Sequence, residues 1–147
     1  MNNQRQKLIE EFVAGSLKIK RFFEQISTIS LEEKIATMLQ MQALEYLNNN
    51  HGSTVSELAQ NLFVSSSSTA QLTDRLVTSG WIKRENDKSD RRIIRLILTS
   101  KGEEELSGMR KKRVEKLNGL LSYLSDHDLS EMVRIQTKLV DAVEKKQ

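Results

Sequence analysis

The sequence predicts a mainly α-helical protein that carries one small β-hairpin. Its 147 residues include no proline, and Leu, Glu, Lys and Gln are frequent, which favours long uninterrupted helices. The segment 54–99 differs, because its pattern is typical of two short helices joined by a tight turn and followed by a basic hairpin. We therefore predict a single domain, residues 1–147, in which a winged helix-turn-helix lobe at about 38–100 is flanked by dimerisation helices at about 4–30 and 103–146.

Two amphipathic helices are expected at the N-terminal end. The second begins after Ser30, since Ser30 and Glu33 have the spacing of a capping box, and it ends after Tyr46-Leu47 in the polar sequence 48–52. The first helix places apolar side chains at helical spacing: Leu8, Ile9, Phe12, Val13, Leu17, Phe22, Phe23 and Ile26.

The helix-turn-helix begins near Val55. Thr54 offers an N-cap hydroxyl and Glu57 follows three residues later, so each side chain can satisfy an amide at the helix start. The apolar spacing breaks at 63–65 and resumes at Thr69. A short first helix, a turn and a second helix follow from this pattern.

The second of these helices has a polar face near its N-terminal end. Leu72 and Leu76 form its inward stripe, and Gly80 ends it. Hydroxyl and amide groups then face outward, where they can reach bases and phosphates in a DNA major groove. The segment taken alone also fits an ordinary surface helix. As a DNA recognition helix, its candidate contact residues are Ser65, which is also placed to cap it, Ser66, Ser67, Gln71 and Arg75.

The hairpin that follows, called the wing below, is expected to pair strands 81–85 and 93–99 across the polar loop 86–92. From Arg75 to Lys101 there are eight basic residues against three acidic ones, a balance of +5, whereas the whole chain carries +3. Positive charge concentrated beside a polar helix face indicates a phosphate-binding surface.

From about residue 38 to 102 the chain resembles the MarR family of transcription regulators. The most specific match is the Asp-Arg-Arg of the wing with the Leu-Thr-x-x-Gly that follows it. Similarity to this family implies a homodimer whose recognition helices enter adjacent major grooves of double-stranded DNA. The matching residues are Thr54-Val55-Ser56-Glu57-Leu58-Ala59, Val64-Ser65, Leu72-Thr73-Asp74-Arg75-Leu76, Gly80-Trp81-Ile82, Asp87 with Asp90-Arg91-Arg92, and Leu98-Thr99 with Lys101-Gly102.

The resemblance also implies roles for the residues of the wing. By position, Arg92 is similar to the family's minor-groove arginine and Asp90 to the carboxylate that orients it. Lys88 and Arg91 would then be phosphate contacts.

Two features depart from the family pattern. Phe63 stands at the turn where Gly is common, and a bulky residue is disfavoured in the left-handed backbone that Gly adopts freely. Ser66 and Gln71 stand where members often carry a long basic residue. We therefore expect base reading to depend on Gln71, which can pair with adenine, and phosphate binding to depend on the wing.

The family resemblance further implies a small aromatic or anionic effector that binds between the DNA-binding lobe and the dimer helices and releases DNA. The residues that could line such a cavity are Phe22, Phe23, Met38, Met41, Tyr46 and Met109. The alternative, that these candidate residues have helical spacing because they pack in the hydrophobic core, stays open.

Two further helices are expected after the wing. Thr99 or Ser100 caps the first, whose first turn is acidic, and Ser125 caps the last. A winged-helix core of roughly 65 residues offers no partner to the terminal helices, so their apolar stripes are expected to pack on each other and on a second copy.

Composition excludes several classes of protein. Neither an apolar leader nor a run of membrane-spanning length is present, so we expect a cytoplasmic protein without a membrane partner. The absence of Cys excludes disulfides and thiol-based redox sensing. His51 and His127 stand alone, so we expect no metal and no cofactor.

Two other functions are weighed against DNA binding. An enzyme needs a nucleophile with a base, or a metal in a cleft, and the chain offers only isolated histidines and no Gly-rich phosphate loop. A winged helix can also be a protein-interaction module without DNA binding. The basic wing favours a sequence-specific DNA-binding regulator, and repression is the commoner outcome in the family.

Overall fold

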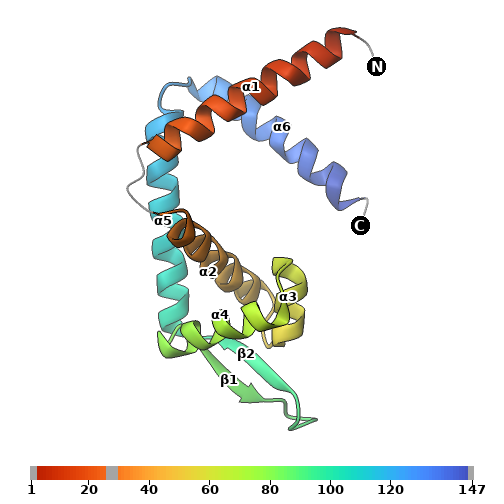
Figure 1. Cartoon of the computed structure of the whole chain (residues 1–147), viewed down its shortest axis with the longest axis vertical. Coiled ribbons are helices and arrows are strands. Elements are labelled where there is room, and N and C mark those ends of the chain that lie inside the picture. Colours follow the sequence, from red (N-terminus) through yellow and green to blue (C-terminus); the bar gives the residue numbers. More distant parts are fainter. Residues whose placement is uncertain (1–2, 26–29, 146–147) are drawn as a thin grey trace. The chain divides into compact units, whose positions relative to one another are not determined.

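The computed structural model describes residues 3–25 and 30–145, without the side chains of Phe23 and Gln25. Ile26, expected in the first helix, lies outside these residues. The described chain is mostly helical with one antiparallel hairpin, so the predicted fold class is confirmed (Figure 1). In chain order the elements are α1 (Asn3–Gln25), α2 (Leu31–Asn49), α3 (Val55–Leu62), α4 (Ser66–Thr78), β1 (Ile82–Asn86), β2 (Ile94–Leu98), α5 (Ser100–Leu121) and α6 (Asp126–Glu144).

The chain divides into two compact units, Met1–Leu39 and Gln40–Gln147, with the boundary inside α2. In the first unit, the apolar side chains of α1 are exposed to solvent, and that of Phe12 is 75% exposed. Ser30 and Glu33 form the predicted capping box, in which Ser30 N–H donates to Glu33 Oε2 (3.0 Å) and Glu33 N–H to Ser30 Oγ (3.2 Å). The second helix therefore begins where the sequence predicts.

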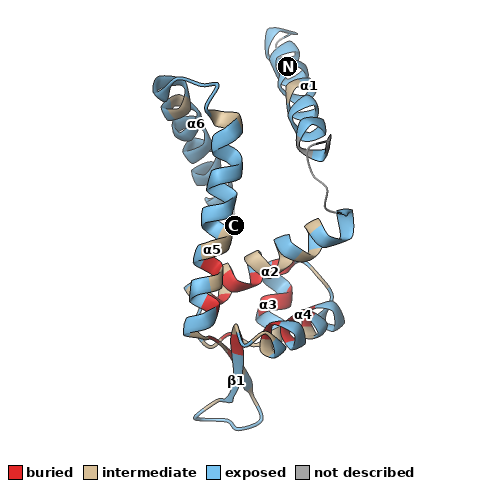
Figure 2. Ribbon diagram, turned by 90° about the vertical axis from the view of Figure 1, so that its left-hand side faces the viewer, coloured by how far each residue is buried: buried red, intermediate tan, exposed pale blue. Residues whose placement is uncertain are grey.

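The hydrophobic core lies in the winged helix-turn-helix lobe of the second unit. There α3 packs against α4 and β2, and α4 packs against β1. Figure 2 shows the buried residues gathered in this lobe and at the start of α5. The buried apolar residues are Ala43, Leu44, Leu47, Leu58, Ala59, Leu62, Leu72, Leu76, Ile82, Leu96, Leu98 and Leu106.

Side-chain caps fix the helix-turn-helix as the sequence predicts. Thr54 and Glu57 form a reciprocal capping box at α3, and Ser65 caps α4 by accepting the Ser68 N–H. Between the helices Phe63 adopts the left-handed conformation itself, with φ 53° and ψ 37°. The turn thus has a backbone that Gly adopts freely, held here by a phenylalanine.

The wing is a short hairpin whose strand ends differ from the prediction by one residue. The register pairs Ile82 with Leu98 and Asn86 with Ile94, so Asn86 belongs to β1 and not to the loop. Trp81 stays outside the strand because its N–H donates to Leu76 O (3.0 Å) at the end of α4. Ile93 stays outside because its N–H donates to Asp90 O (3.0 Å) within the loop, which therefore runs from 87 to 93.

The base of the wing is joined to α5. Thr99, one of the two predicted caps, accepts the Gly102 N–H (3.1 Å) and donates to Gly80 O (2.7 Å). A Cβ on Gly102 would lie 2.0 Å from Trp81 O, so only glycine fits this approach. Ser125 and Asp128 form the capping box of α6, a helix in which no residue from Asp126 to Glu144 is buried.

Candidate nucleic-acid interface

The exposed face of α4 is polar, as the sequence predicts. Thr69, Leu72, Thr73 and Leu76 are buried on its inward side. The hydroxyl, amide and guanidinium groups of the other side are exposed, on a helix that lies directly above the hairpin in Figure 1. The exposed residues of this face include Ser66, Ser67, Gln71, Asp74 and Arg75.

The serines at the start of α4 are not equivalent. The Ser65 hydroxyl is occupied at the helix start, where it lies 3.0 Å from Ser67 Oγ and donates to Ser68 Oγ (2.8 Å). The Ser66 hydroxyl has no hydrogen bond to any described residue. Ser66 is therefore a freer donor and acceptor than Ser65.

One acidic side chain, Asp74, also lies on the exposed face of α4. Arg84 of β1 donates to Asp74 Oδ1 (2.6 Å) and to Thr73 Oγ1 (3.1 Å). This contact neutralises a charge that would repel phosphate, and it ties α4 to the wing. Sequence reasoning missed it, because no spacing pattern predicts a contact between two residues of different elements that are ten positions apart.

Asp87 organises the wing loop. Its Oδ1 accepts from Ser89 N–H (2.8 Å), Ser89 Oγ (2.5 Å) and Asp90 N–H (3.1 Å). Its Oδ2 accepts from Arg95 Nε (2.8 Å). These hydrogen bonds, above all that of the Ser89 hydroxyl, hold the pKa of Asp87 far below its ordinary value. The sequence signal for this turn was an Asp two residues before a Ser.

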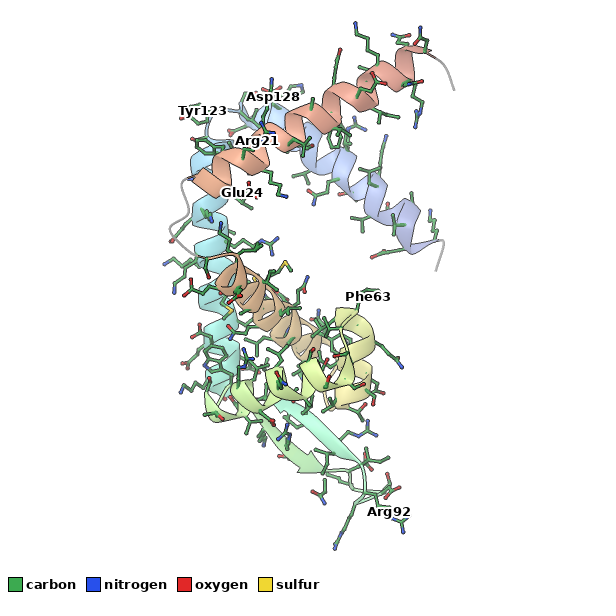
Figure 3. The ribbon with its side chains drawn as sticks, viewed as in Figure 1. Arg21, Glu24, Phe63, Arg92, Tyr123 and Asp128 are labelled. Atoms are coloured by element: carbon green, nitrogen blue, oxygen red, sulfur yellow. The ribbon has the colours of Figure 1, made fainter. Side chains whose placement is uncertain are left out.

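Asp90 contacts Arg92 through the main chain. Its Oδ1 accepts the Arg92 N–H (2.9 Å), while Asn86 Nδ2 donates to Arg91 O (3.0 Å). The carboxylate therefore shapes the backbone that carries the wing-tip arginine. Figure 3 shows Arg92 at the far end of the hairpin.

Half of the basic residues counted in the sequence are already engaged. Lys83 pairs with Glu85, Arg84 with Asp74 and Arg95 with Asp87, and Lys101 Nζ donates to Ser79 O. Among the described residues, no carboxylate or other acceptor lies within hydrogen-bonding or ion-pair distance of the charged groups of the other four. These four free cations are Arg75, Lys88, Arg91 and Arg92.

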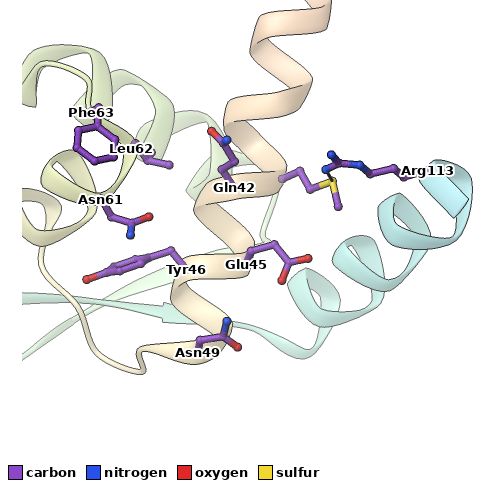
Figure 4. A pocket seen from close by; sticks show the side chains of 9 residues that line it. Gln42, Glu45, Tyr46, Asn49, Asn61, Leu62, Phe63 and Arg113 are labelled. Carbon is purple, nitrogen blue, oxygen red and sulfur yellow. Dashed lines mark hydrogen bonds between the residues drawn. The ribbon is translucent and has the colours of Figure 1, made fainter. Parts of the chain in front are cut away.

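A cavity of about 410 Å³ opens elsewhere in the second unit, between α2, the end of α3 and α5 (Figure 4). Of the six cavity residues expected from the sequence, Met41 and Tyr46 line it and Met109 does not. Phe22 and Met38 belong to the first unit, and the Phe23 side chain lies outside the described residues. The cavity is lined by Met41, Gln42, Glu45, Tyr46, Asn49, Asn61, Leu62, Phe63 and Arg113.

The cavity holds one carboxylate and one guanidinium that differ in their partners. Arg110 Nε donates to Glu45 Oε1 (2.7 Å), and the hydrogen bonds from Arg110 lower the pKa of Glu45. Arg113 Nη1 lies 3.9 Å from Met41 Sδ, and no described carboxylate lies within ion-pair distance of it. Two guanidinium groups, those of Arg110 and Arg113, act on the one carboxylate of Glu45, so the net charge at this cavity is positive.

Two kinds of feature are absent from the described residues. No cluster of three or more His, Asp or Glu side chains with the geometry of a metal site occurs among them. None of the helices in the described part of the chain has the length and apolar character needed to cross a membrane.

Comparison with known proteins agrees with the winged helix-turn-helix architecture. A model of the MarR family matches residues 36–93. The HTH-type transcriptional regulator YpoP of Bacillus subtilis is 31% identical over 123 residues, which are 82% of this chain and 87% of that protein. The HTH-type transcriptional repressor MdtR of the same organism is 28% identical over 131 residues, or 87% of this chain and 84% of the relative.

Solved structures agree with the sequence relatives. The YusO protein from Bacillus subtilis superposes with a TM-score of 0.69 at 26% identity, over 93% of this chain and 97% of that one. A MarR family protein from Bacillus stearothermophilus gives a TM-score of 0.68 at 26% identity, over 98% and 99%. The chain is therefore a transcription regulator, not an enzyme, and it belongs to the MarR family of winged helix-turn-helix proteins.

Proposed function

We propose that this regulator is a homodimeric repressor that binds a pseudo-palindromic site in double-stranded DNA. We further propose that the protein acts in the cytoplasm and that it represses transcription by occupying its operator. Two copies related by a two-fold axis present their recognition helices to half-sites about one helical turn, roughly 10 base pairs, apart.

The observation that carries this proposal is the free charge beside the recognition helix. Lys88, Arg91 and Arg92 in the wing loop and Arg75 on α4 have no acceptor within reach among the described residues, whereas their basic neighbours are paired. Unpaired cations suit phosphate, because no internal ion pair has to be broken on binding. Ser66, Ser67 and Gln71 add exposed hydrogen-bonding groups for base edges.

The homodimer is supported by apolar side chains that one chain leaves in water. On α6 they lie on one side of the helix, and α1 carries a second set. Monomeric proteins rarely expose such continuous apolar stripes, so we assign both helices, at about residues 4–30 and 103–146 with α5, to the dimer interface. The exposed residues of α6 are Met132, Val133, Ile135, Leu139, Val140 and Val143.

We assign the α2, α3 and α5 cavity to a small aromatic anion that releases DNA. Tyr46 and Phe63 supply aromatic surface, and the Arg113 guanidinium, which shares the Glu45 carboxylate with Arg110, supplies positive charge. The cavity touches the end of α3 and its turn, so a ligand there can shift the recognition helix relative to α5.

The experiment that tests DNA binding is fluorescence anisotropy with pooled double-stranded DNA over a salt series. We expect log affinity to fall linearly with log salt concentration, and Arg91→Ala/Arg92→Ala to abolish most of the binding while remaining a folded dimer. Lys111→Ala/Lys112→Ala, which removes two exposed charges from α5, is the matched control and retains binding.

The outcome also decides against the alternative. No binding by the wild type at low salt, or equal binding by both double variants, would favour a protein-interaction module on the same fold.

A further inference from the structure

One side chain of the wing, Arg95, reaches two segments that are distant in sequence. Its Nε donates to Asp87 Oδ2 (2.8 Å) at the start of the wing loop. Its Nη1 donates to Gly52 O (3.1 Å) in the connection between α2 and α3, and lies 4.0 Å from Glu57 Oε2. A single guanidinium therefore joins the wing loop to the helix-turn-helix.

The lobe end of this link is fixed. Leu96 N–H donates to Ser53 O (2.8 Å), which lays the segment after Gly52 alongside β2. The next residue, Thr54, is bonded into the capping box of α3 with Glu57. The Gly52 carbonyl thus belongs to the rigid start of α3.

The wing end is fixed as well. Asp87 uses Oδ1 for the three hydrogen bonds that close the loop at Ser89 and Asp90, and keeps Oδ2 for Arg95. Movement of the Asp87 carboxylate would therefore carry along the loop that bears Lys88, Arg91 and Arg92.

The hairpin has few contacts that hold this end in place. One residue pair nearer its base, Arg84 donates to Asp74 and Thr73 of α4. The hairpin has only two strands of five residues, and in β1 only Ile82, at its base, is buried. Two-stranded ribbons are marginally stable and twist readily. Among the described residues, no hydrogen bond or ion pair joins the hairpin to the rest of the lobe nearer to the wing tip than those of Arg95.

We propose that Arg95, held between Asp87 and the Gly52 carbonyl, is a positioning residue that sets the angle of the wing relative to the recognition helix. This inference rests on the proposed DNA binding. The recognition helix and the wing must reach two grooves of the same duplex at once, and a wing fixed beforehand loses less conformational entropy on binding. Arg95 itself is paired, so its role is to orient the free cations of the loop.

Asp87→Asn separates this role from simple electrostatics. The change removes a negative charge from a DNA-binding surface, which by charge alone strengthens binding. An Asn side chain has one oxygen where Asp87 has two. With its NH2 group toward Arg95 the hydrogen bond from Arg95 is lost, and with that group toward the loop the hydrogen bonds from Ser89 and Asp90 are lost, so either orientation breaks the connection from Arg95 to the loop. We expect Asp87→Asn to weaken DNA binding about tenfold at fixed salt.

Two further variants complete the test: Glu85→Gln is the control for charge, and Arg95→Lys breaks the link from its other side. Glu85→Gln removes the same charge from the wing, but Glu85 pairs with Lys83 and takes no part in the link, so binding is expected to hold or tighten. Arg95→Lys keeps the charge but its single ammonium group does not reproduce the planar fork to Asp87 and Gly52, so binding is expected to fall severalfold without a change in net charge.

A double-mutant cycle with Arg92→Ala distinguishes positioning from a loss of stability. If the link orients Arg92, the affinity lost on Arg92→Ala is at least about fivefold smaller in the Asp87→Asn background than in the wild type. Thermal unfolding of each variant, measured beside the anisotropy titration, establishes that the protein tested is folded. The Arg95→Lys background gives the same cycle if Asp87→Asn does not fold.

The outcomes separate the two proposals. Suppose that the wild type binds DNA. If a folded Asp87→Asn variant then binds as tightly or more tightly, or if Arg92→Ala has the same effect in both backgrounds, the role of Arg95 is overturned while the proposed DNA binding stands. Absence of wild-type binding at low salt would overturn the proposed DNA binding and this inference with it.

Discussion

Phe63 shows how far a single residue can be predicted. The sequence located the turn between α3 and α4, because the apolar spacing breaks there. It could not show that Phe63 itself takes φ 53°, because that conformation is imposed by the packing of α3 on α4 and not by the residue's own preference. The side chain is 92% exposed, so little packing offsets a left-handed backbone that costs an L residue about 1–2 kcal/mol.

We therefore expect Phe63→Gly to raise the free energy of unfolding by about 1 kcal/mol, since Gly adopts this conformation without the steric cost. Gly52→Ala, at φ 76°, is the matched control and lowers it by a similar amount. Urea unfolding at one protein concentration measures both. Destabilisation by Phe63→Gly would show that the phenyl ring packs against a partner.

The two kinds of DNA contact can be separated at Arg92 and Gln71. Arg92 lies at the wing tip, so Arg92→Ala should weaken binding to all duplexes by about 10- to 100-fold. Gln71 is exposed on α4, so Gln71→Ala should mainly relax sequence preference. Anisotropy with a selected and a scrambled duplex measures both effects, and small equal losses for the two variants would contradict these roles.

At the scale of elements, helix starts were predictable and strand ends were not. Each start depends on a local signal, such as Thr54 with Glu57 or Ser125 with Asp128. The strand ends depend on contacts between segments, such as Trp81 N–H with Leu76 O. The Leu-Thr-x-x-Gly sequence gains a physical reason in the structure, because Gly102 lies against the Trp81 carbonyl.

Gly102 provides the sharpest test at this scale. Gly102→Ala places a methyl group on a backbone oxygen and is expected to cost about 1–3 kcal/mol or more of unfolding free energy. Gly108→Ala lies in the same helix with nothing within 4 Å of the added atom, and is expected to add up to about 1 kcal/mol. Thermal unfolding of both variants gives the comparison, and equal effects would argue against the close approach at Trp81.

For the whole molecule, sequence composition could not show which charges are available. The +5 balance from Arg75 to Lys101 already subtracts the acidic residues, but it does not show that Lys83, Arg84 and Arg95 are the paired basic residues. Only the folded contacts distinguish the free cations from the paired ones. The apolar stripes of the terminal helices, by contrast, were predictable because helical spacing alone reveals them.

The dimer is tested by a charge placed on the α6 stripe. Leu139 is exposed in one chain, and its burial in a dimer would contribute about 1.5–3 kcal/mol per side chain. Leu139→Asp is therefore expected to shift the protein to monomer at micromolar concentration, whereas Lys138→Asp on the polar side of α6 leaves it dimeric. Sedimentation equilibrium measures the mass. Dimers of normal stability in Leu139→Asp would exclude α6 from the interface.

The central claim, a two-fold symmetric dimer reading DNA, is tested most directly by selecting binding sites from a pool of random duplexes. We expect the enriched sequences to contain an inverted repeat with half-site centres roughly 10 base pairs apart, bound by two chains per duplex. A selection that enriches no sequence, or a single unrepeated half-site bound by one chain, would contradict the account.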